Sequence, residues 1–296
     1  MSKAVPGHIG AYRLLNVVHT GHGSMLWQAY DDAKQRIVGI KTLRDDFLRD
    51  REQIGYLRQE YKVGRQVVHP RIIEVYSFDS DRGVPYVAIE WFAAPNMKQR
   101  ILQGLDKIAP LTPTIVDQAA EALGHFNRKG WVHRDIKPDN FLVADDGSVK
   151  LIDFALARRS RRGLAKWLTP RSKIQGTKSY IAPEQIRGVA VDQRSDLYSL
   201  ACTIHELVSG KPPFTGVNAN DLLMKHLKSP PPSLEGLNPN VTPEFAHLIR
   251  RALAKNPNTR PETVDDFLVE FRMIRLFKVA PSANLCKSLA CGTDEV

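Results

Sequence analysis

Residues 133–140, with the sequence His-Arg-Asp-Ile-Lys-Pro-Asp-Asn, are dense in groups that could do chemistry. Because Pro138 stands between Asp135 and Asn140, this stretch should be a loop and not a helix. Apolar runs on both sides predict that the loop is held between buried segments. A fixed loop that offers a carboxylate to orient a hydroxyl, a lysine to offset charge and an amide able to hold Mg²⁺ suits phosphoryl transfer, and Asp153 follows it in the sequence as a further carboxylate.

The loop resembles the catalytic loop of the eukaryotic-like protein kinases, whose pattern is H-R-D-x-K-x-x-N, and all five fixed positions match. A polar turn that carries the motif by chance is the alternative. By resemblance, Asp135 accepts or orients the proton of the substrate hydroxyl. Lys137 lies over the γ-phosphate of ATP and favours a serine/threonine enzyme. Asn140 and Asp153 hold Mg²⁺ through oxygen ligands.

Lys41 lies in Val38-Gly39-Ile40-Lys41, which resembles the strand motif V-A-I-K of the same family. The resemblance implies that Lys41 holds the α and β phosphates of ATP. Glu60, on the helix that follows, is the expected partner of this lysine. An exposed strand lysine and an exposed helix glutamate are the alternative interpretations of the two residues.

The glycine loop expected above the phosphates matches less well. Aligned on the strand that follows, the family's three glycine positions fall on His19, Gly21 and Ser24, so only the middle one is kept. A shifted frame that uses Gly21 and Gly23 fits the following strand less well, and a hairpin without a nucleotide role is a further alternative. The resemblance places Val18 and Leu26 on either side of the adenine, and assigns Glu90 to the nucleotide site as well.

The sequence Asp153-Phe154-Ala155 resembles the family's D-F-G but ends in alanine. The metal-binding carboxylate is kept, while alanine restricts the φ angles that a glycine would allow. We therefore expect Mg²⁺ binding to be preserved and the conformational swing of this segment to be altered.

A long, basic segment runs from Asp153 to Glu184 and closes with Gly-Thr-Lys-Ser-Tyr-Ile-Ala-Pro-Glu, which is similar to the family's G-T-x-x-Y-x-A-P-E. Thr177 is expected near Asp135, where it would shape the acceptor site. Two structural roles follow from the resemblance: Glu184 pairs with Arg260, and Asp196 anchors the backbone of the catalytic loop.

Arg134 precedes the catalytic aspartate, and enzymes of this type are often switched by phosphorylation of the segment. We expect the phosphorylated residue to be Thr169 or Ser172, with Ser160 a weaker candidate. The alternative interpretation of the basic run is a solvated loop. A further hypothesis is that the run recruits acidic substrates.

The elements that must position these residues form two groups. Residues 12–43 and 72–90 read as strands around one helix over 51–68, which His69-Pro70 ends. From Thr112, read as an N-cap, onward the pattern is mostly helical. This is the α+β, bilobal architecture of the protein kinases: a small N-terminal antiparallel sheet lobe with one main helix, and a larger, mainly helical C-terminal lobe. We expect a kinase domain over 10–275, with the N-lobe at about 10–92, the hinge at about 93–96 and the C-lobe at about 97–275, and a tail or linker over 276–296.

Composition limits the class of protein. The net charge is +10 at 296 residues, which favours anionic partners without choosing among them. Three cysteines without a pairing pattern favour a reducing compartment, and no run of apolar residues is long enough to cross a membrane. We therefore expect a cytoplasmic location, with an anchor outside this chain left open, and no nucleic-acid partner.

The sequence predicts an ATP- and Mg²⁺-dependent kinase that phosphorylates serine or threonine in protein substrates. It is also expected to phosphorylate its own activation segment, which is the basic segment from Asp153 to Glu184. Its compact segments resemble those of bacterial members of the family. The alternative is a pseudokinase that binds nucleotide or serves as a scaffold. Its support is the altered glycine loop and Ala155, both of which affect positioning.

Overall fold

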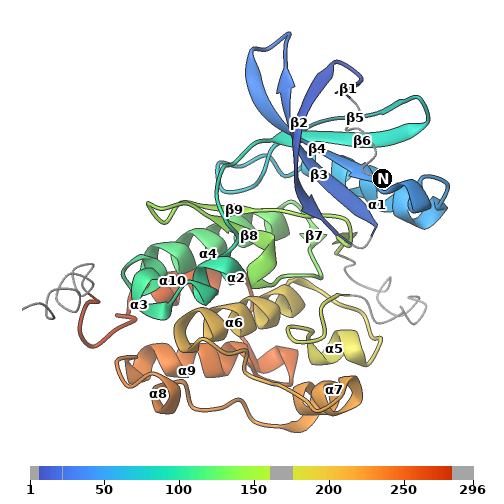
Figure 1. Ribbon diagram of the computed structural model, residues 1–296. Coiled ribbons are helices and arrows are strands. Elements are labelled where there is room, and N and C mark those ends of the chain that lie inside the picture. The colour runs from blue at the N-terminus through green and yellow to red at the C-terminus, as the bar shows by residue number, and fades with distance from the viewer. Residues whose placement is uncertain (1–6, 22, 161–175, 282–296) are drawn as a thin grey trace, which may run out of the picture.

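A computed structural model describes residues 7–21, 23–160 and 176–281. It has two lobes, one above the other in Figure 1, so the expected bilobal α+β architecture is confirmed. The upper lobe contains an antiparallel sheet with the order β1-β2-β3-β4-β6-β5. Its strands are β1 (His8–Ile9), β2 (Tyr12–Thr20), β3 (Ser24–Asp31), β4 (Arg36–Leu43), β5 (Val75–Asp81) and β6 (Val84–Glu90).

The two faces of this sheet carry different side chains, because successive side chains along a strand point to opposite faces. Val38 and Ile40 of β4 point into a small buried cluster with Trp27. Lys41 points to the opposite face, as do its cross-strand neighbours Leu26 and Val87. Lys41 therefore points toward Asp153 of the lower lobe. The buried cluster on the other face stabilises the sheet.

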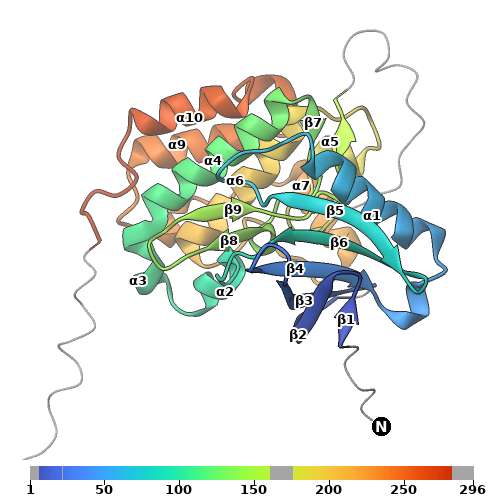
Figure 2. The same ribbon diagram turned by 90° about the horizontal axis from the view of Figure 1, so that it is seen from above.

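Helix α1 (Arg51–Gly64) covers the sheet on the side of β5 and β6 (Figure 2). The Asp50 carboxylate caps it by accepting from two backbone N–H groups in the first turn. The helix ends at Gly64, four residues before the expected end at residue 68, and β5 begins at Val75 instead of residue 72. The later start of β5 has a physical reason, because residues 71–73 use their backbone to pair with Leu151 in the lower lobe.

The connection between the lobes runs from the end of β6 at Glu90 to the start of α2 (Met97–Leu102). Asn96 caps α2 in a reciprocal capping box with Gln99. Both ends of the connection are fastened to the lower lobe, since Lys150 contacts the Glu90 carboxylate at 2.6 Å and Val143 N donates to Pro95 O at 2.9 Å.

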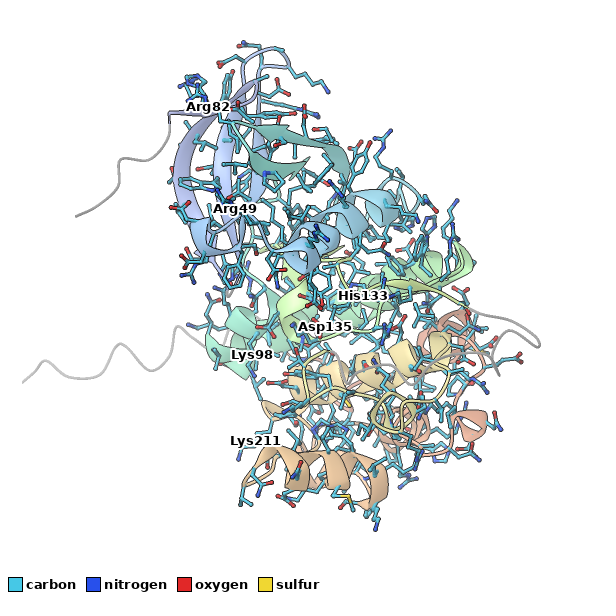
Figure 3. The ribbon with its side chains drawn as sticks, turned by 90° about the vertical axis from the view of Figure 1, so that its right-hand side faces the viewer. Arg49, Arg82, Lys98, His133, Asp135 and Lys211 are labelled. Carbon is cyan, nitrogen blue, oxygen red and sulfur yellow. The ribbon has the colours of Figure 1, made fainter. Side chains whose placement is uncertain are left out.

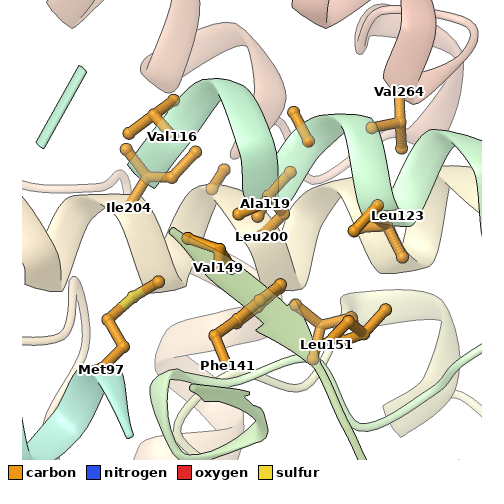
Figure 4. Close-up of a cluster of buried hydrophobic side chains, with 14 of the residues drawn as sticks. Met97, Val116, Ala119, Leu123, Phe141, Val149, Leu151, Leu200, Ile204 and Val264 are labelled. Carbon is orange, nitrogen blue, oxygen red and sulfur yellow. The ribbon is translucent and has the colours of Figure 1, made fainter. Parts of the chain in front are cut away.

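The core of the lower lobe lies between three helices, α4 (Thr112–Arg128), α6 (Gln193–Ser209) and α10 (Val264–Arg272), and the hairpin of β8 (Phe141–Val143) and β9 (Val149–Leu151) (Figure 4). Buried aliphatic side chains from each of these elements meet there, including Leu123, Leu151, Leu200 and Val264. Glycines 130 and 210, with φ of 81° and 76°, follow the ends of α4 and α6. Thr112 is the first residue of α4, and its hydroxyl donates to Ile108 O instead of capping the helix as expected.

The remaining helices and strands of the lower lobe are α3 (Leu105–Ile108), β7 (Trp131–Val132), β10 (Arg158–Arg159), α5 (Pro183–Ile186), α7 (Ala219–Lys228), α8 (Leu234–Leu237) and α9 (Pro243–Ala252). Single-turn 3₁₀ helices are η1 (Asp45–Phe47), η2 (Ala109–Leu111), η3 (Pro138–Asn140) and η5 (Pro257–Thr259). Within the described ranges, none of the helices has the length and apolar character needed to cross a bilayer.

Candidate active site

Lys41 lies between two carboxylates from distant parts of the chain. Its Nζ is 2.7 Å from Glu60 Oε2 on α1 and 3.6 Å from Asp153 Oδ1, which follows β9. The ion pair expected between Lys41 and Glu60 is therefore present, and the upper-lobe lysine does converge with Asp153. The Glu60 side chain is 4% exposed and that of Asp153 is 38% exposed, so the open side of the group is at Asp153.

Electrostatics favour the charged forms of Lys41 and Asp153, whereas burial raises the pKa of Glu60. Burial alone would lower the pKa of Lys41, but the carboxylates of Asp153 and Glu60 outweigh it and raise that pKa above its usual range. Burial likewise works to raise the pKa of Asp153. The Lys41 ammonium, together with His133, the Ala155 N–H and Lys137, outweighs burial, so the pKa of Asp153 is lowered. At neutral pH the site presents an ammonium and a carboxylate to solvent side by side.

The predicted catalytic loop brings its functional side chains together around one carboxylate. Lys137 Nζ lies 2.8 Å from Asp135 Oδ2 and also donates to Thr177 Oγ1 at 2.9 Å. Thr177 N donates to Asp135 Oδ1 at 2.9 Å, and Asn140 Nδ2 donates to Asp135 O at 2.7 Å. The basic segment is thus attached to the loop through Thr177, as expected. With its nitrogen engaged, Asn140 has Oδ1 as the atom that could face a metal.

Asp196 on α6 holds the backbone of this loop. Its carboxylate accepts from His133 N at 2.8 Å and from Arg134 N at 2.9 Å. A further bond comes from Asn127 Nδ2 at 2.9 Å. Burial works to raise the pKa of Asp196, and the neighbouring His133 and these donors oppose it. Sequence reasoning missed Asn127, which stands in the last turn of α4, where polar residues are usually solvated.

The segment after Asp153 is packed inward. Phe154 is fully buried between the rings of Phe126 and His133. Ala155 is not among the described residues with a positive φ, whereas Asp153 is, with φ of 65°. The alanine therefore fits the conformation seen here without strain, and the residue that carries the unusual backbone is the aspartate itself.

The residues expected around the nucleotide base and phosphates differ in their position and their exposure to solvent. Leu26 shares the face of Lys41, and Val18 is 48% exposed at an irregularity between β2 and β3. Gly21 N donates to Ser24 O in the turn of this hairpin. The Glu90 carboxylate is engaged by Lys150, so a contact from Glu90 to a nucleotide would come from its backbone.

The expected buried ion pair between Glu184 and Arg260 is present, with two short contacts of 2.7 and 3.0 Å. Ser195 Oγ adds a third donor to Glu184 at 2.6 Å. Of the candidate phosphorylation sites, Thr169 and Ser172 lie outside the described residues. Ser160 is described, and its backbone N donates to Gly130 O.

Arg134 is buried, and its Nε has no hydrogen-bond partner among the described residues. Burial and the nearby Arg158 guanidinium lower the pKa of Arg134. Two arginines thus stand close together beside the start of the basic segment.

Residues 12–269 match the protein kinase domain family. The chain is 32% identical over 267 residues to the serine/threonine-protein kinase PrkC of Bacillus subtilis, an alignment that covers 89% of this chain and 40% of PrkC. It is 33% identical to PknB of Mycolicibacterium smegmatis (87% of this chain, 42% of PknB) and 34% identical to PknA of Mycobacterium tuberculosis (85% and 58%), both named serine/threonine-protein kinases. The chain spans about two fifths of the length of the first two relatives.

Proposed function

The chain belongs to the protein kinase family, and from this premise we propose that it transfers the γ-phosphoryl group of ATP to serine or threonine hydroxyls of proteins. The observation that carries the proposal is the convergence of Lys41, Glu60 and Asp153, beside a loop in which Asp135 is held by Lys137 and Thr177. The names of the relatives support the class of acceptor, and so does Lys137, the residue that favours a serine/threonine enzyme.

The acceptor hydroxyl would be oriented by Asp135, whose carboxylate is fixed from three sides before any substrate arrives. This preorganisation lowers the entropic cost of aligning the hydroxyl with the phosphoryl group. Lys137 lies within hydrogen-bonding distance of that carboxylate and would neutralise charge that develops on the transferred group. Lys41, kept protonated, would hold the non-transferred phosphates.

The residues present fit Mg²⁺, which needs only one or two protein ligands when phosphates and water supply the others. The described residues accordingly need no cluster of three or more acidic, histidine or cysteine side chains, and they contain none. One carboxylate, Asp153, and the Asn140 amide oxygen are what Mg²⁺ takes from proteins when phosphate oxygens and water complete its shell. When bound, the ion would offset the negative charge of the phosphates. The Ile152 N to Asn140 O bond of 2.9 Å links the two ligand-bearing segments.

We also propose that the activation segment is phosphorylated by the enzyme itself. The Arg134 Nε, which has no partner within the described part of the chain, and the nearby Arg158 guanidinium would both be able to bind a phosphate group. Because Arg134 N is bonded to Asp196, an anion at this point would reinforce the loop that carries Asp135.

The test is incorporation of label from γ-labelled ATP and Mg²⁺ into the chain and into a generic protein substrate, compared with Asp135→Asn. We expect the variant to be slower by roughly 10² to 10⁴-fold, because it loses the carboxylate that orients the hydroxyl. Matched thermal unfolding of the two proteins controls for damage to the fold. Equally negligible labelling by both would replace the proposed enzyme with the nucleotide-binding or scaffolding alternative.

A further inference from the structure

A buried carboxylate that takes no part in the proposed reaction lies beside the catalytic loop. Glu206 of α6 is 1% exposed, and its Oε2 accepts a 2.5 Å hydrogen bond from the Tyr180 hydroxyl. Its other oxygen, Oε1, is paired with Lys98 Nζ. Burial and Glu206 together raise the pKa of Tyr180, which keeps the phenol a donor.

Lys98 is the part of this group that solvent can reach. Its side chain is 34% exposed and comes from the first turn of α2, which packs against both η3 of the catalytic loop and α6. In Figure 3, Lys98 lies below and to the left of Asp135. Asp139 of η3 is exposed and also acts on the Tyr180 phenol, so it lies near the same group.

The position of this group matters because a substrate chain must pass it. Tyr180 N donates to Thr177 O, and Thr177 is bonded to Asp135, so the group belongs to the wall that borders the acceptor position. An extended peptide advances about 3.3 Å per residue. A few residues from the acceptor would therefore bring a substrate side chain to Lys98.

We infer that Lys98 is a specificity-determining residue: by covering the Glu206 carboxylate it makes this wall disfavour substrates with a basic side chain near the acceptor. The inference rests on the proposed kinase activity. Glu206 and Asp139 would attract an arginine or lysine of the substrate. Lys98, however, already neutralises Glu206 and would repel the positive charge of that substrate residue. The substrates that fit are proteins whose acceptor is flanked by neutral or acidic residues.

The test uses a peptide library with a fixed central threonine and one arginine, alanine or glutamate at each flanking position in turn. The quantity measured is the ratio of kcat/KM for the arginine peptide to that for the alanine peptide. For Lys98→Ala we expect this ratio to rise roughly fivefold at one or two neighbouring positions, the size of one partly screened charge interaction. A purely structural role of Lys98 would lower the rates for all peptides together and leave the ratio unchanged.

Three further variants sharpen the result. Lys98→Arg keeps the charge and should keep the wild-type ratio. Adding Glu206→Gln to Lys98→Ala should reduce the gain for arginine, because the newly exposed carboxylate is removed while Asp139 remains. Lys107→Ala, an exposed lysine of α3, is the matched control and should leave the ratio unchanged.

The inference is overturned if the wild-type enzyme phosphorylates the library and Lys98→Ala shows an unaltered ratio at every position. It is also overturned if the wild type already prefers arginine at the positions that Lys98→Ala affects. If the wild-type enzyme phosphorylates none of the peptides or proteins offered, the proposed function itself fails, and the inference fails with it.

Discussion

Arg134 and Asp153 have φ angles of 71° and 65°, and both lie in the active site. A left-handed backbone costs a non-glycine residue on the order of 1 kcal/mol, so it persists only where the surroundings impose it. Here Asp196 holds the backbone N–H of Arg134, and Lys41 attracts the Asp153 carboxylate. The site therefore stores local strain at the two residues that flank the proposed chemistry, and none at Ala155.

We predict that Ala155→Gly will destabilise the protein. Because the alanine has an ordinary φ, glycine there would only add conformational freedom to the unfolded chain, which should lower the free energy of unfolding by about 0.4–1 kcal/mol. Urea denaturation measures the change. Arg82→Gly, at an exposed residue with φ of 49°, is the control and should be neutral or stabilising. An increase in stability for Ala155→Gly would show that residue 155 adopts a left-handed conformation in solution.

At the scale of the elements, α1 determines whether Glu60 reaches Lys41. The helix approaches β5 closely because Gly64 has no side chain: a Cβ there would lie 2.2 Å from Val75 Cγ2. The other glycine of the helix, Gly55, has nothing within 4 Å of its would-be Cβ. One glycine is thus required by packing, while the other only weakens the helix.

The two glycines give a matched pair of predictions. Gly64→Ala should push α1 away from β5, cost about 1–3 kcal/mol of unfolding free energy, and raise the KM for ATP as the Lys41–Glu60 pair loosens. Gly55→Ala should stabilise the protein by about 0.5–1 kcal/mol and leave the KM for ATP unchanged. Chemical denaturation and steady-state kinetics measure the two effects. Similar stability in both variants would mean that the helix does not approach β5 as closely as described.

At the scale of the whole molecule, the lower lobe is the larger packed unit and contains its own buried polar chain. Lys255 Nζ lies 3.3 Å from the Tyr198 oxygen, and the Tyr198 hydroxyl lies 3.0 Å from His226 Nδ1. Since the lysine occupies the phenol oxygen, the phenol hydrogen is free to donate to the histidine. Burial, with the Lys255 ammonium adding to it, lowers the pKa of His226 to about 4.

This histidine predicts acid sensitivity. A pKa lower in the folded than in the unfolded state means that acid favours unfolding: the contribution is complete above about pH 6.5 and is lost as the pH falls toward 4. The loss should reach about 3 kcal/mol. The measurement is the free energy of unfolding at several pH values. His226→Gln should show a shallower decline over this range, and parallel curves for the two proteins would contradict the assignment.

The sequence predicted those parts of the site whose local conformation is determined by residues close together in the chain. The run from His133 to Asn140 is such a case, because its proline and its spacing both favour a loop. The Lys41–Glu60 pair followed from the resemblance to the kinase motifs, and one strand and one helix bring the two residues together. The roles assigned to Val18, Gly21, Leu26 and Glu90 at a nucleotide, and the domain limits, remain predictions.

What local reasoning could not provide depends on contacts between distant residues. The late start of β5 depends on backbone pairing of residues 71–73 with Leu151, a contact that no local signal indicates. Lys98 and Glu206 are 108 residues apart, and each reads as an ordinary helical residue. The hydrogen bond from Asn127 to Asp196 likewise exists only because α4 and α6 pack side by side.

The lysine held between Glu60 and Asp153 has one more consequence. Amine-selective acylating reagents attack only the unprotonated amine, and the two carboxylates keep that form of Lys41 scarce. Chemical labelling should therefore spare this residue while the lobes are together, although it stands beside the partly exposed Asp153. Modification at Lys41 would then serve as a reporter that the upper and lower halves of the enzyme have come apart.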